Sequence, residues 1–352
     1  MTKALVEVRD LAVRFATPDG PIAALNGVDF SVAAGEVMTI LGESGSGKSV
    51  TLRALMRLLP QQRTTVSGII RIGEHRIDQL DERTLAELRG TLVSMIFQEP
   101  MLAFDPVYTV GRQIVETIIR HEGTDEARAR ARARELLERV QIPSAERRLS
   151  NYPHEMSGGM RQRAMIALAL ACRPALLLAD EPTTALDATV QIQILLLLRE
   201  LQSELGMTVI FVTHDIGVAT EIADSLAVMY AGRIVEHGPV RAVLRAPAHP
   251  YTRGLLASTL QRGMRGRRLE AIPGMPPSLA DLPPGCSFAP RCSLVTPACG
   301  ERVPPMTEID ADHSARCLLA VPRLPGAAWG APTARRRPVS DPAPRPAPAR
   351  SL

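Results

Sequence analysis

One eight-residue stretch constrains the fold of this chain more than any other. It has the sequence Gly42-Glu43-Ser44-Gly45-Ser46-Gly47-Lys48-Ser49, which fits the pattern G-x-x-x-x-G-K-[ST]. An apolar, strand-like run precedes this phosphate loop at residues 37–41, and a helix-like run follows it at residues 50–59. Glycines let such a loop point its N–H groups inward, and the following helix presents its positive end to an anion. We therefore expect Lys48 to contact the β- and γ-phosphates of a nucleotide and Ser49 to coordinate Mg²⁺.

The composition limits the class of protein. With 352 residues, 45% of them hydrophobic, the chain is long enough for one large domain and a smaller one. It has no uninterrupted apolar run long enough for a transmembrane helix and no apolar signal core near Met1, so we expect a cytoplasmic protein. Most of the net charge of +4 comes from arginines after residue 321. The nearly neutral body argues against a nucleic-acid-binding surface.

Short strands are expected before the phosphate loop. They lie at residues 5–8, 12–15 and 28–32, with turns at residues 17–20 and 26–27. An antiparallel sheet should therefore precede the loop. Phe15 ends one of these strands, where it either stacks on an adenine or is a half-buried strand aromatic.

Three later strands end in polar side chains. The run at residues 92–98 ends in Gln98, the run at 175–179 is followed by Asp180 and Glu181, and the run at 208–212 by Thr213 and His214. Wholly apolar runs are typical of buried parallel strands, and ligands bind at the carboxyl ends of such strands. We expect Asp180 to hold Mg²⁺ and Glu181 to polarise water. His214 is either part of this site or a buried core histidine.

Two helical regions complete the sequence before residue 250. Residues 109–149 predict helices, in which arginines alternate with alanine; a solvated helix is favoured over an anion-binding patch. Ser157, Gly158 and Gly159 precede an apolar helix, where Ser157 suits an N-cap and the glycines expose N–H groups to an anion. Cys172 lies in the apolar stretch after this helix start and is expected in the core.

In this order the motifs resemble those of the ATP-binding subunit of ABC transporters, over residues 5–260. The corresponding segments are the phosphate loop, the Q-loop glutamine Gln98, the signature at Met156–Met160, the Walker B strand at Leu176–Asp180 with the catalytic Glu181, the D-loop Ala185-Leu186-Asp187 and the switch His214. Met156, Met160 and Phe15 depart from the usual leucine, glutamine and tyrosine.

The resemblance implies an α/β P-loop NTPase fold at residues 1–250, with a parallel-sheet core, an antiparallel β subdomain and a helical subdomain at about residues 100–160. It implies ATP hydrolysis in a head-to-tail dimer, with each ATP between the phosphate loop of one chain and Ser157, Gly158 and Gly159 of the other. The implied catalytic residues are Glu181, His214 and Gln98, and the implied Mg²⁺ ligands are Ser49, Gln98 and Asp180. Nucleotide contacts are implied for Phe15, the phosphate loop, the signature residues and Asp187.

The C-terminal region, residues 251–320, is rich in proline and needs a staple to fold. It contains Cys286, Cys292, Cys299 and Cys317. Disulfides are disfavoured in the cytosol, whereas four thiolates suit Zn²⁺ or a [4Fe–4S] cluster, and His313 is a spare zinc ligand. Four unliganded thiols are the third alternative. Residues 321–352, rich in Pro, Ala and Arg, are expected to be disordered.

The C-terminal region also resembles the dipeptide/oligopeptide importer subgroup, through His249-Pro250-Tyr251-Thr252 and residues 272–277. This resemblance favours a [4Fe–4S] cluster over zinc. It implies a peptide importer with two transmembrane permease subunits, a second and paralogous ATPase subunit and a periplasmic or extracellular solute-binding protein. This chain would be peripheral on the cytoplasmic face of the inner membrane. Nickel, glutathione or another solute is the alternative cargo. A DNA-maintenance or translation ATPase is disfavoured, because the chain has one ATP domain and no coiled-coil insertion.

Overall fold

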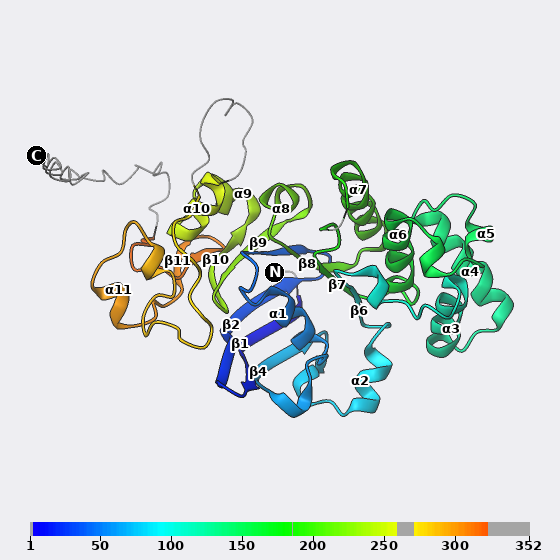
Figure 1. The fold of residues 1–352 in the computed structure, drawn as a ribbon, viewed down its shortest axis with the longest axis horizontal. Helices are drawn as coiled ribbons and strands as arrows, with labels where there is room; N and C mark the ends of the chain where they lie inside the picture. The colour runs from blue at the N-terminus through cyan, green and yellow to red at the C-terminus, as the bar shows by residue number, and fades with distance from the viewer. Residues whose placement is uncertain (1–2, 185, 259–270, 323–352) are drawn as a thin grey trace, which may run out of the picture. The chain divides into compact units, whose positions relative to one another are not determined.

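The apolar runs of the sequence form the middle of an eight-stranded sheet in the computed structural model, which describes residues 3–184, 186–258 and 271–322 (Figure 1). In spatial order this central sheet contains β11 (Thr307–Asp310), β12 (His313–Ala315), β10 (Arg233–Pro239), β9 (Ser225–Tyr230), β3 (Val37–Leu41), β8 (Thr208–Thr213), β7 (Leu176–Asp180) and β6 (Val93–Ile96). The strands from β9 to β6 run parallel. Every residue of β3, β7 and β8 is buried, as wholly apolar runs predict. Strand β6 ends at Ile96, so Gln98 lies two residues beyond it and not at its last position.

A second, antiparallel sheet confirms the expected β subdomain. It contains, in spatial order, β2 (Gly20–Ala33), β1 (Ala4–Thr17), β4 (Thr64–Ile72) and β5 (His75–Arg76). The separate strands expected at residues 5–8 and 12–15 are one strand, because a bulge with positive φ at Asp10 bends β1 without ending it. The turn expected at residues 26–27 is wrong: Gly27 has a φ of 72° inside β2, where a Cβ would lie 3.1 Å from Asp10 Oδ1. The turn between Thr17 and Gly20 is confirmed.

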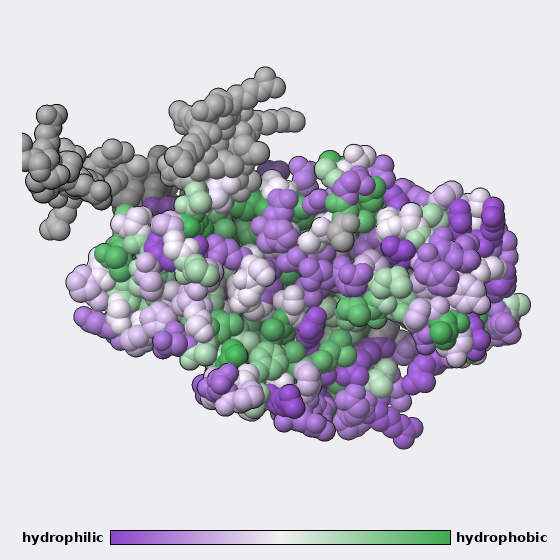
Figure 2. Space-filling view, viewed as in Figure 1, coloured by the Kyte–Doolittle hydropathy of each residue, from purple (hydrophilic) through white to green (hydrophobic). Residues whose placement is uncertain are grey.

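Helices cover the central sheet, and a separate group of helices lies beyond β6 and β7 (Figure 1). The helices before residue 223 are α1 (Lys48–Leu55), α2 (Glu82–Leu88), α3 (Val110–Glu122), α4 (Glu126–Arg139), α5 (Ala145–Arg148), α6 (Gly158–Ala169), α7 (Ala188–Leu205) and α8 (Ile216–Ile222). On α4, three of the alternating arginines form surface ion pairs, with Asp125, Glu146 and Glu138. Figure 2 shows mostly hydrophilic side chains over α3 to α5, which agrees with the solvated helix expected there.

The C-terminal region is attached to the central sheet. Helices α9 (Val240–Arg245) and α10 (Pro250–Ala257) lead into it, and it contains α11 (Ala298–Glu301) and the β11–β12 hairpin. Strand β12 pairs with β10, and the carboxylate of Glu236 in β10 accepts N–H groups from Ala248 and His249 and contacts His313 Nε2 at 2.9 Å. The proline-rich C-terminal region therefore contributes two strands to the sheet that contains β3, the strand before the phosphate loop. The domain boundary at residue 250 stays a prediction, and residues 323–352 lie outside the described part.

Within the described residues, none of the helices combines the length and the apolar character that crossing a membrane requires.

Candidate nucleotide-binding site

The phosphate loop joins the end of β3 to the start of α1, as its sequence predicts. Gly45 and Gly47 have φ angles of 77° and 109°, which side chains rarely tolerate. At Gly42 the space itself is missing, because a Cβ would lie 2.3 Å from the carbonyl oxygen of Met229 in β9. The loop is thus shaped by its glycines and presses against the central sheet.

Lys48 lines the cavity next to the phosphate loop and is buried, with 4% of its surface exposed. Its Nζ donates to the carbonyl oxygens of Gly42, at 2.9 Å, and Glu43, at 3.0 Å, and lies 3.7 Å from Glu181 Oε1. Burial lowers the pKa of Lys48, and the charges of Glu181 and Asp180 oppose this shift. The lysine is a buried cation whose main partners are loop carbonyls, which a phosphate oxygen can replace.

Ser49 and Asp180 lie together beside Lys48. The Ser49 hydroxyl donates to Asp180 Oδ1 at 2.7 Å. Burial raises the pKa of Asp180, and the hydrogen bond from Ser49 acts in the opposite direction. A hydroxyl and a carboxylate oxygen at this spacing fit the oxygen ligands that Mg²⁺ prefers.

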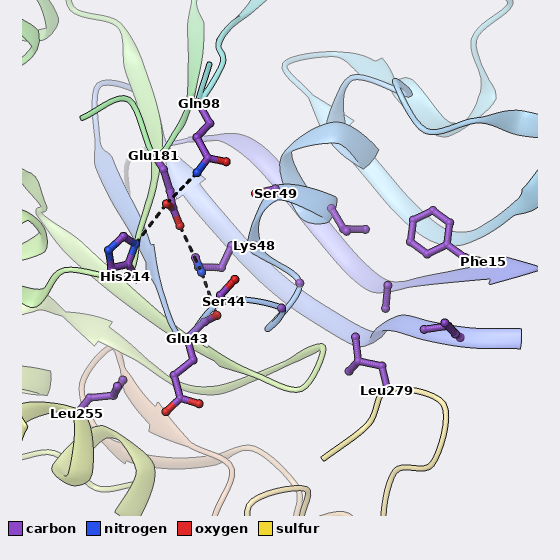
Figure 3. A pocket seen from close by; sticks show the side chains of 15 residues that line it. Phe15, Glu43, Ser44, Lys48, Ser49, Gln98, Glu181, His214, Leu255 and Leu279 are labelled. Carbon is purple, nitrogen blue, oxygen red and sulfur yellow. Dashed lines mark hydrogen bonds and ion pairs between the residues drawn. The ribbon is translucent and has the colours of Figure 1, made fainter. Parts of the chain in front are cut away.

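Glu181 is the point at which the side chains of three strand ends meet. Its carboxylate accepts hydrogen bonds from Thr184 Oγ1 at 2.9 Å and Gln98 Nε2 at 3.4 Å, and His214 Nδ1 lies 3.2 Å away (Figure 3). Its backbone has a φ of 44°, a strained conformation for a residue other than glycine, which is common at functional sites. In this structure Gln98 therefore contacts Glu181, and its role as a Mg²⁺ ligand stays a prediction.

One cavity of about 690 Å³ connects these residues to Phe15. Lys48, Gln98, Glu181 and His214 form its polar end, and Phe15 lies at the other end, near Leu279 (Figure 3). A charged end and an apolar end in one cavity of this size fit a nucleotide triphosphate and its base.

Leu279 is a cavity residue that sequence reasoning missed. It comes from the C-terminal region, where its carbonyl oxygen accepts the N–H of Ala23 in β2 at 3.4 Å. Nothing in the local sequence around Leu279 indicates a ligand site, because its position depends on a contact between segments some 250 residues apart.

Three predicted residues of the phosphate loop and β7, namely Gly42, Ser46 and Asp180, are not among the residues that line this cavity. Four further predicted site residues, at the starts of two helices, do not line it either. Ser157 is the N-cap of α6 and accepts the N–H of Met160, as predicted, while Gly158 and Gly159 begin the helix. Asp187 is the N-cap of α7. Their contact with nucleotide stays a prediction that requires a second chain. Ala185 of the predicted D-loop lies outside the described residues.

The four cysteines of the C-terminal region line one small cavity of about 10 Å³, with apolar neighbours that include Phe288 and Leu294. The N–H of Leu294 donates to Cys292 Sγ at 3.4 Å, and Thr296 Oγ1 lies 3.3 Å from Cys299 Sγ. Burial raises the pKa of the Cys286, Cys292 and Cys317 thiols. Even so, no group of three or more His, Cys, Asp or Glu side chains in the described ranges is arranged to hold a metal ion. His313, the spare zinc ligand, does not line this cavity.

Cys172 is expected to be unreactive toward thiol reagents at pH 8. Burial raises the pKa of Cys172 to about 11, so its thiolate fraction should be on the order of a hundredfold below that of an ordinary cysteine and should recover only as the pH approaches 11. The rate at which iodoacetamide alkylates Cys172 can be measured by mass spectrometry of the peptides, with urea-unfolded protein as the control. If Cys172 in the folded protein were alkylated as fast as a free thiol, its burial and raised pKa would be contradicted.

Solved structures define the class of protein to which this site belongs. A structure of the ATP-binding cassette MJ0796, described as a dimer in a post-hydrolysis state bound to ADP and Pi, is 30% identical, has a TM-score of 0.61 and covers 67% of this chain and 99% of its own. CbiO1 from Clostridium perfringens, part of an ABC transporter complex, is 29% identical with a TM-score of 0.58 and covers 69% of this chain and 91% of its own. Fold and site are those of an ATP-binding cassette.

Sequence comparisons define the family more narrowly. Residues 25–184 match the family described as ABC transporter, and residues 235–299 match the oligopeptide/dipeptide transporter C-terminal region. A putative peptide import ATP-binding protein from Brucella melitensis is 50% identical over 89% of this chain and 96% of its own length. The oligopeptide transport ATP-binding protein OppD from Salmonella typhimurium is 46% identical over 91% and 95%. The chain belongs to the ATP-binding subunits of ABC transporters, in the oligopeptide/dipeptide transporter subgroup.

Proposed function

We propose that this protein hydrolyses ATP to drive the import of dipeptides or oligopeptides through an ABC transporter. The observation that carries the proposal is the cavity of about 690 Å³, with the phosphate loop at its polar end and Phe15 at its apolar end. The peptide cargo is supported by the relatives, whose names describe peptide import and oligopeptide transport.

In this proposal each part of the site has a defined task. The N–H groups of the phosphate loop and the Lys48 ammonium bind the triphosphate, and Phe15 stacks on the base. Ser49 and Asp180 hold Mg²⁺, which neutralises phosphate charge when it is bound. Glu181 accepts the proton of the attacking water. Gln98 and His214 both contact the Glu181 carboxylate and orient that carboxylate.

The exposed signature residues support a two-chain site. Ser157 and Gly158 are exposed at the start of α6 and do not line the cavity of their own chain. We infer that they close the nucleotide site of a second, paralogous ATPase subunit, together with Asp187. The ATPase pair lies on the cytoplasmic face of the membrane and works with two transmembrane permease subunits and with a solute-binding protein on the periplasmic or extracellular side. The two ATPase subunits close on ATP and reopen after hydrolysis, and this movement is passed to the permease subunits.

Reconstitution with the cognate second ATPase, the permeases and the solute-binding protein tests this function. We expect MgATP binding by the full chain and ATP hydrolysis in the complex that rises when the solute-binding protein carries peptide. Absence of both nucleotide binding and hydrolysis would overturn the ATPase role. Stimulation by nickel or glutathione in place of peptide would overturn only the cargo.

We further infer that Cys286, Cys292, Cys299 and Cys317 hold a [4Fe–4S] cluster, for which their side chains would have to move from the arrangement in the described ranges, where no such group forms a metal site. All four thiols line one cavity with apolar walls, and a main-chain N–H already points at Cys292 Sγ. Thiolate ligands with N–H donors to sulfur are typical of such clusters. A cluster would join segments of the C-terminal region that have little regular structure.

Metal analysis of anaerobically purified protein is expected to find about four iron and four sulfide per chain. The Cys299→Ser variant should lose both, whereas Cys172→Ser, the matched control, should keep them. If the metal analysis finds one zinc per chain and no sulfide, the four cysteines bind zinc and not a cluster. Four reactive thiols without metal would eliminate both.

A further inference from the structure

The phosphate loop is held from outside by one buried arginine. Arg291 lies in the C-terminal region, 248 residues after Glu43, and only 8% of its surface is exposed. Its guanidinium contacts both carboxylate oxygens of Glu43, at 2.9 Å and 3.2 Å. Two-point contacts of this kind fix the position as well as the charge of a carboxylate.

The surroundings of Arg291 direct it at this carboxylate. Its Nε donates to the carbonyl oxygen of Pro273 at 3.0 Å, and a terminal nitrogen lies 3.3 Å from the Tyr230 hydroxyl. These partners are neutral, so Glu43 is the acidic group with which Arg291 forms an ion pair in the described part of the chain. The Arg291 side chain is buried and that of Glu43 is 28% exposed, and the remaining hydrogen bonds of Arg291 hold its guanidinium in place beside Glu43.

The main chain of Glu43 is held from the same side. Its N–H donates to the hydroxyl of Tyr251, at the start of α10, at 3.0 Å. Tyr251 packs in turn against Tyr230 and Phe288. The C-terminal region thus contacts the second residue of the phosphate loop through both its backbone and its side chain.

Glu43 places a negative charge in a cavity built for an anion. It lines the cavity, and Figure 3 shows its carboxylate turned away from Lys48. An unpaired carboxylate next to a triphosphate repels it, whereas a carboxylate paired with Arg291 is neutralised and held aside. Leu279, also in the C-terminal region, reaches the apolar end of the same cavity.

We propose that Arg291 is a positioning residue for nucleotide binding, which neutralises Glu43 and couples the C-terminal region to the phosphate loop. This inference rests on the proposed ATPase function. Cys292, which lines the cysteine cavity, directly follows Arg291 in the sequence. A change in the packing of that cavity therefore acts next to the Arg291–Glu43 ion pair.

The test compares MgATP dissociation constants of full-length variants by calorimetry. Arg291→Gln is expected to bind MgATP about tenfold more weakly, which corresponds to about 1.4 kcal/mol. Glu43→Gln/Arg291→Gln should recover to within about threefold of the unmodified protein, since the repelling charge is gone. The loss in Arg291→Gln should also shrink in high salt, because screening weakens a repulsion between partly exposed charges.

Arg316→Gln is the matched control. Arg316 also lies in the C-terminal region and also donates to main-chain carbonyls, of Ile234 and Pro304. Unlike Arg291, it forms no ion pair with Glu43 in the described part of the chain. We expect its MgATP affinity to stay within about twofold of the unmodified protein. If Arg291→Gln does not fold, Arg291→Lys replaces it, because lysine keeps the charge but loses the two-point contact; about threefold weaker binding is expected.

Three results would overturn the inference: unchanged affinity in the folded Arg291 variant, a double variant as weak as Arg291→Gln, or an equal loss in Arg316→Gln. Each of these leaves ATP binding by the unmodified chain intact. Failure of the unmodified chain to bind MgATP would instead overturn the proposed function.

Discussion

Replacing Glu181 with glutamine is expected to slow ATP hydrolysis by about 10²–10⁴-fold while MgATP is still bound. Glutamine has nearly the size of glutamate and can still contact Gln98 and His214, but it cannot accept a proton from water. The strained backbone at Glu181, the hydrogen bonds from Thr184 and Gln98 and the contact with His214 hold the carboxylate in one place, so the variant should lose chemistry and keep structure. Turnover of the assembled complex and nucleotide affinity of the purified chain are the two measurements.

Glu200→Gln is a suitable control for this variant, because it makes the same chemical change at an exposed position on α7. We expect its turnover to match that of the unmodified protein. Unchanged hydrolysis in Glu181→Gln would remove Glu181 from the role of base. Loss of nucleotide binding in that variant would assign Glu181 to binding instead.

Replacing Lys48 with alanine should weaken MgATP binding about tenfold to a hundredfold. A hydrogen bond to a charged group contributes about 1.5–3 kcal/mol, and the buried Lys48 ammonium is the cation nearest the phosphate loop carbonyls. Calorimetry on the purified chain measures the loss. Near-normal affinity would contradict the assignment of the phosphate loop.

The sequence supplies an internal control for Lys48, because the chain has only one other lysine, Lys3. Lys3 is exposed and pairs with Glu74 on the surface. Lys3→Ala should therefore bind MgATP normally. In the unmodified protein, MgATP should protect Lys48 from acetylation without affecting the acetylation of Lys3. If MgATP left the acetylation of Lys48 unchanged, a phosphate contact at Lys48 would be contradicted.

Features that depend on neighbouring residues in the chain were predictable. The phosphate loop follows from its glycines, and the strands that end near Asp180 and His214 follow from unbroken apolar runs. The N-cap at Ser157 follows from the same local logic. The antiparallel sheet was predicted in outline but not in detail. Asp10 and Gly27 resemble turn residues, yet paired strands on either side absorb both as irregularities within β1 and β2.

Features that depend on distant contacts were not predictable. The sequence around Arg291 gives no sign of a salt bridge, and only the packing of α10 and Phe288 against Tyr230 brings it to Glu43. His313 looked like a spare metal ligand, but it is fully buried against Glu236 and does not line the cysteine cavity. The proline content of the C-terminal region gave no indication that two short strands there would extend the central sheet.

The pairing of β12 with β10 has a consequence for how this protein can be divided. A chain cut after α9 would uncover the backbone of β10 and leave the carboxylate of Glu236 without its histidine, and an open strand edge of this kind invites association with other chains. The segment that follows the cassette is therefore not an interchangeable module. A different C-terminal region joined to this ATPase would have to supply a strand that pairs with β10 in place of β12. Only then could a regulatory effect of the new region be measured.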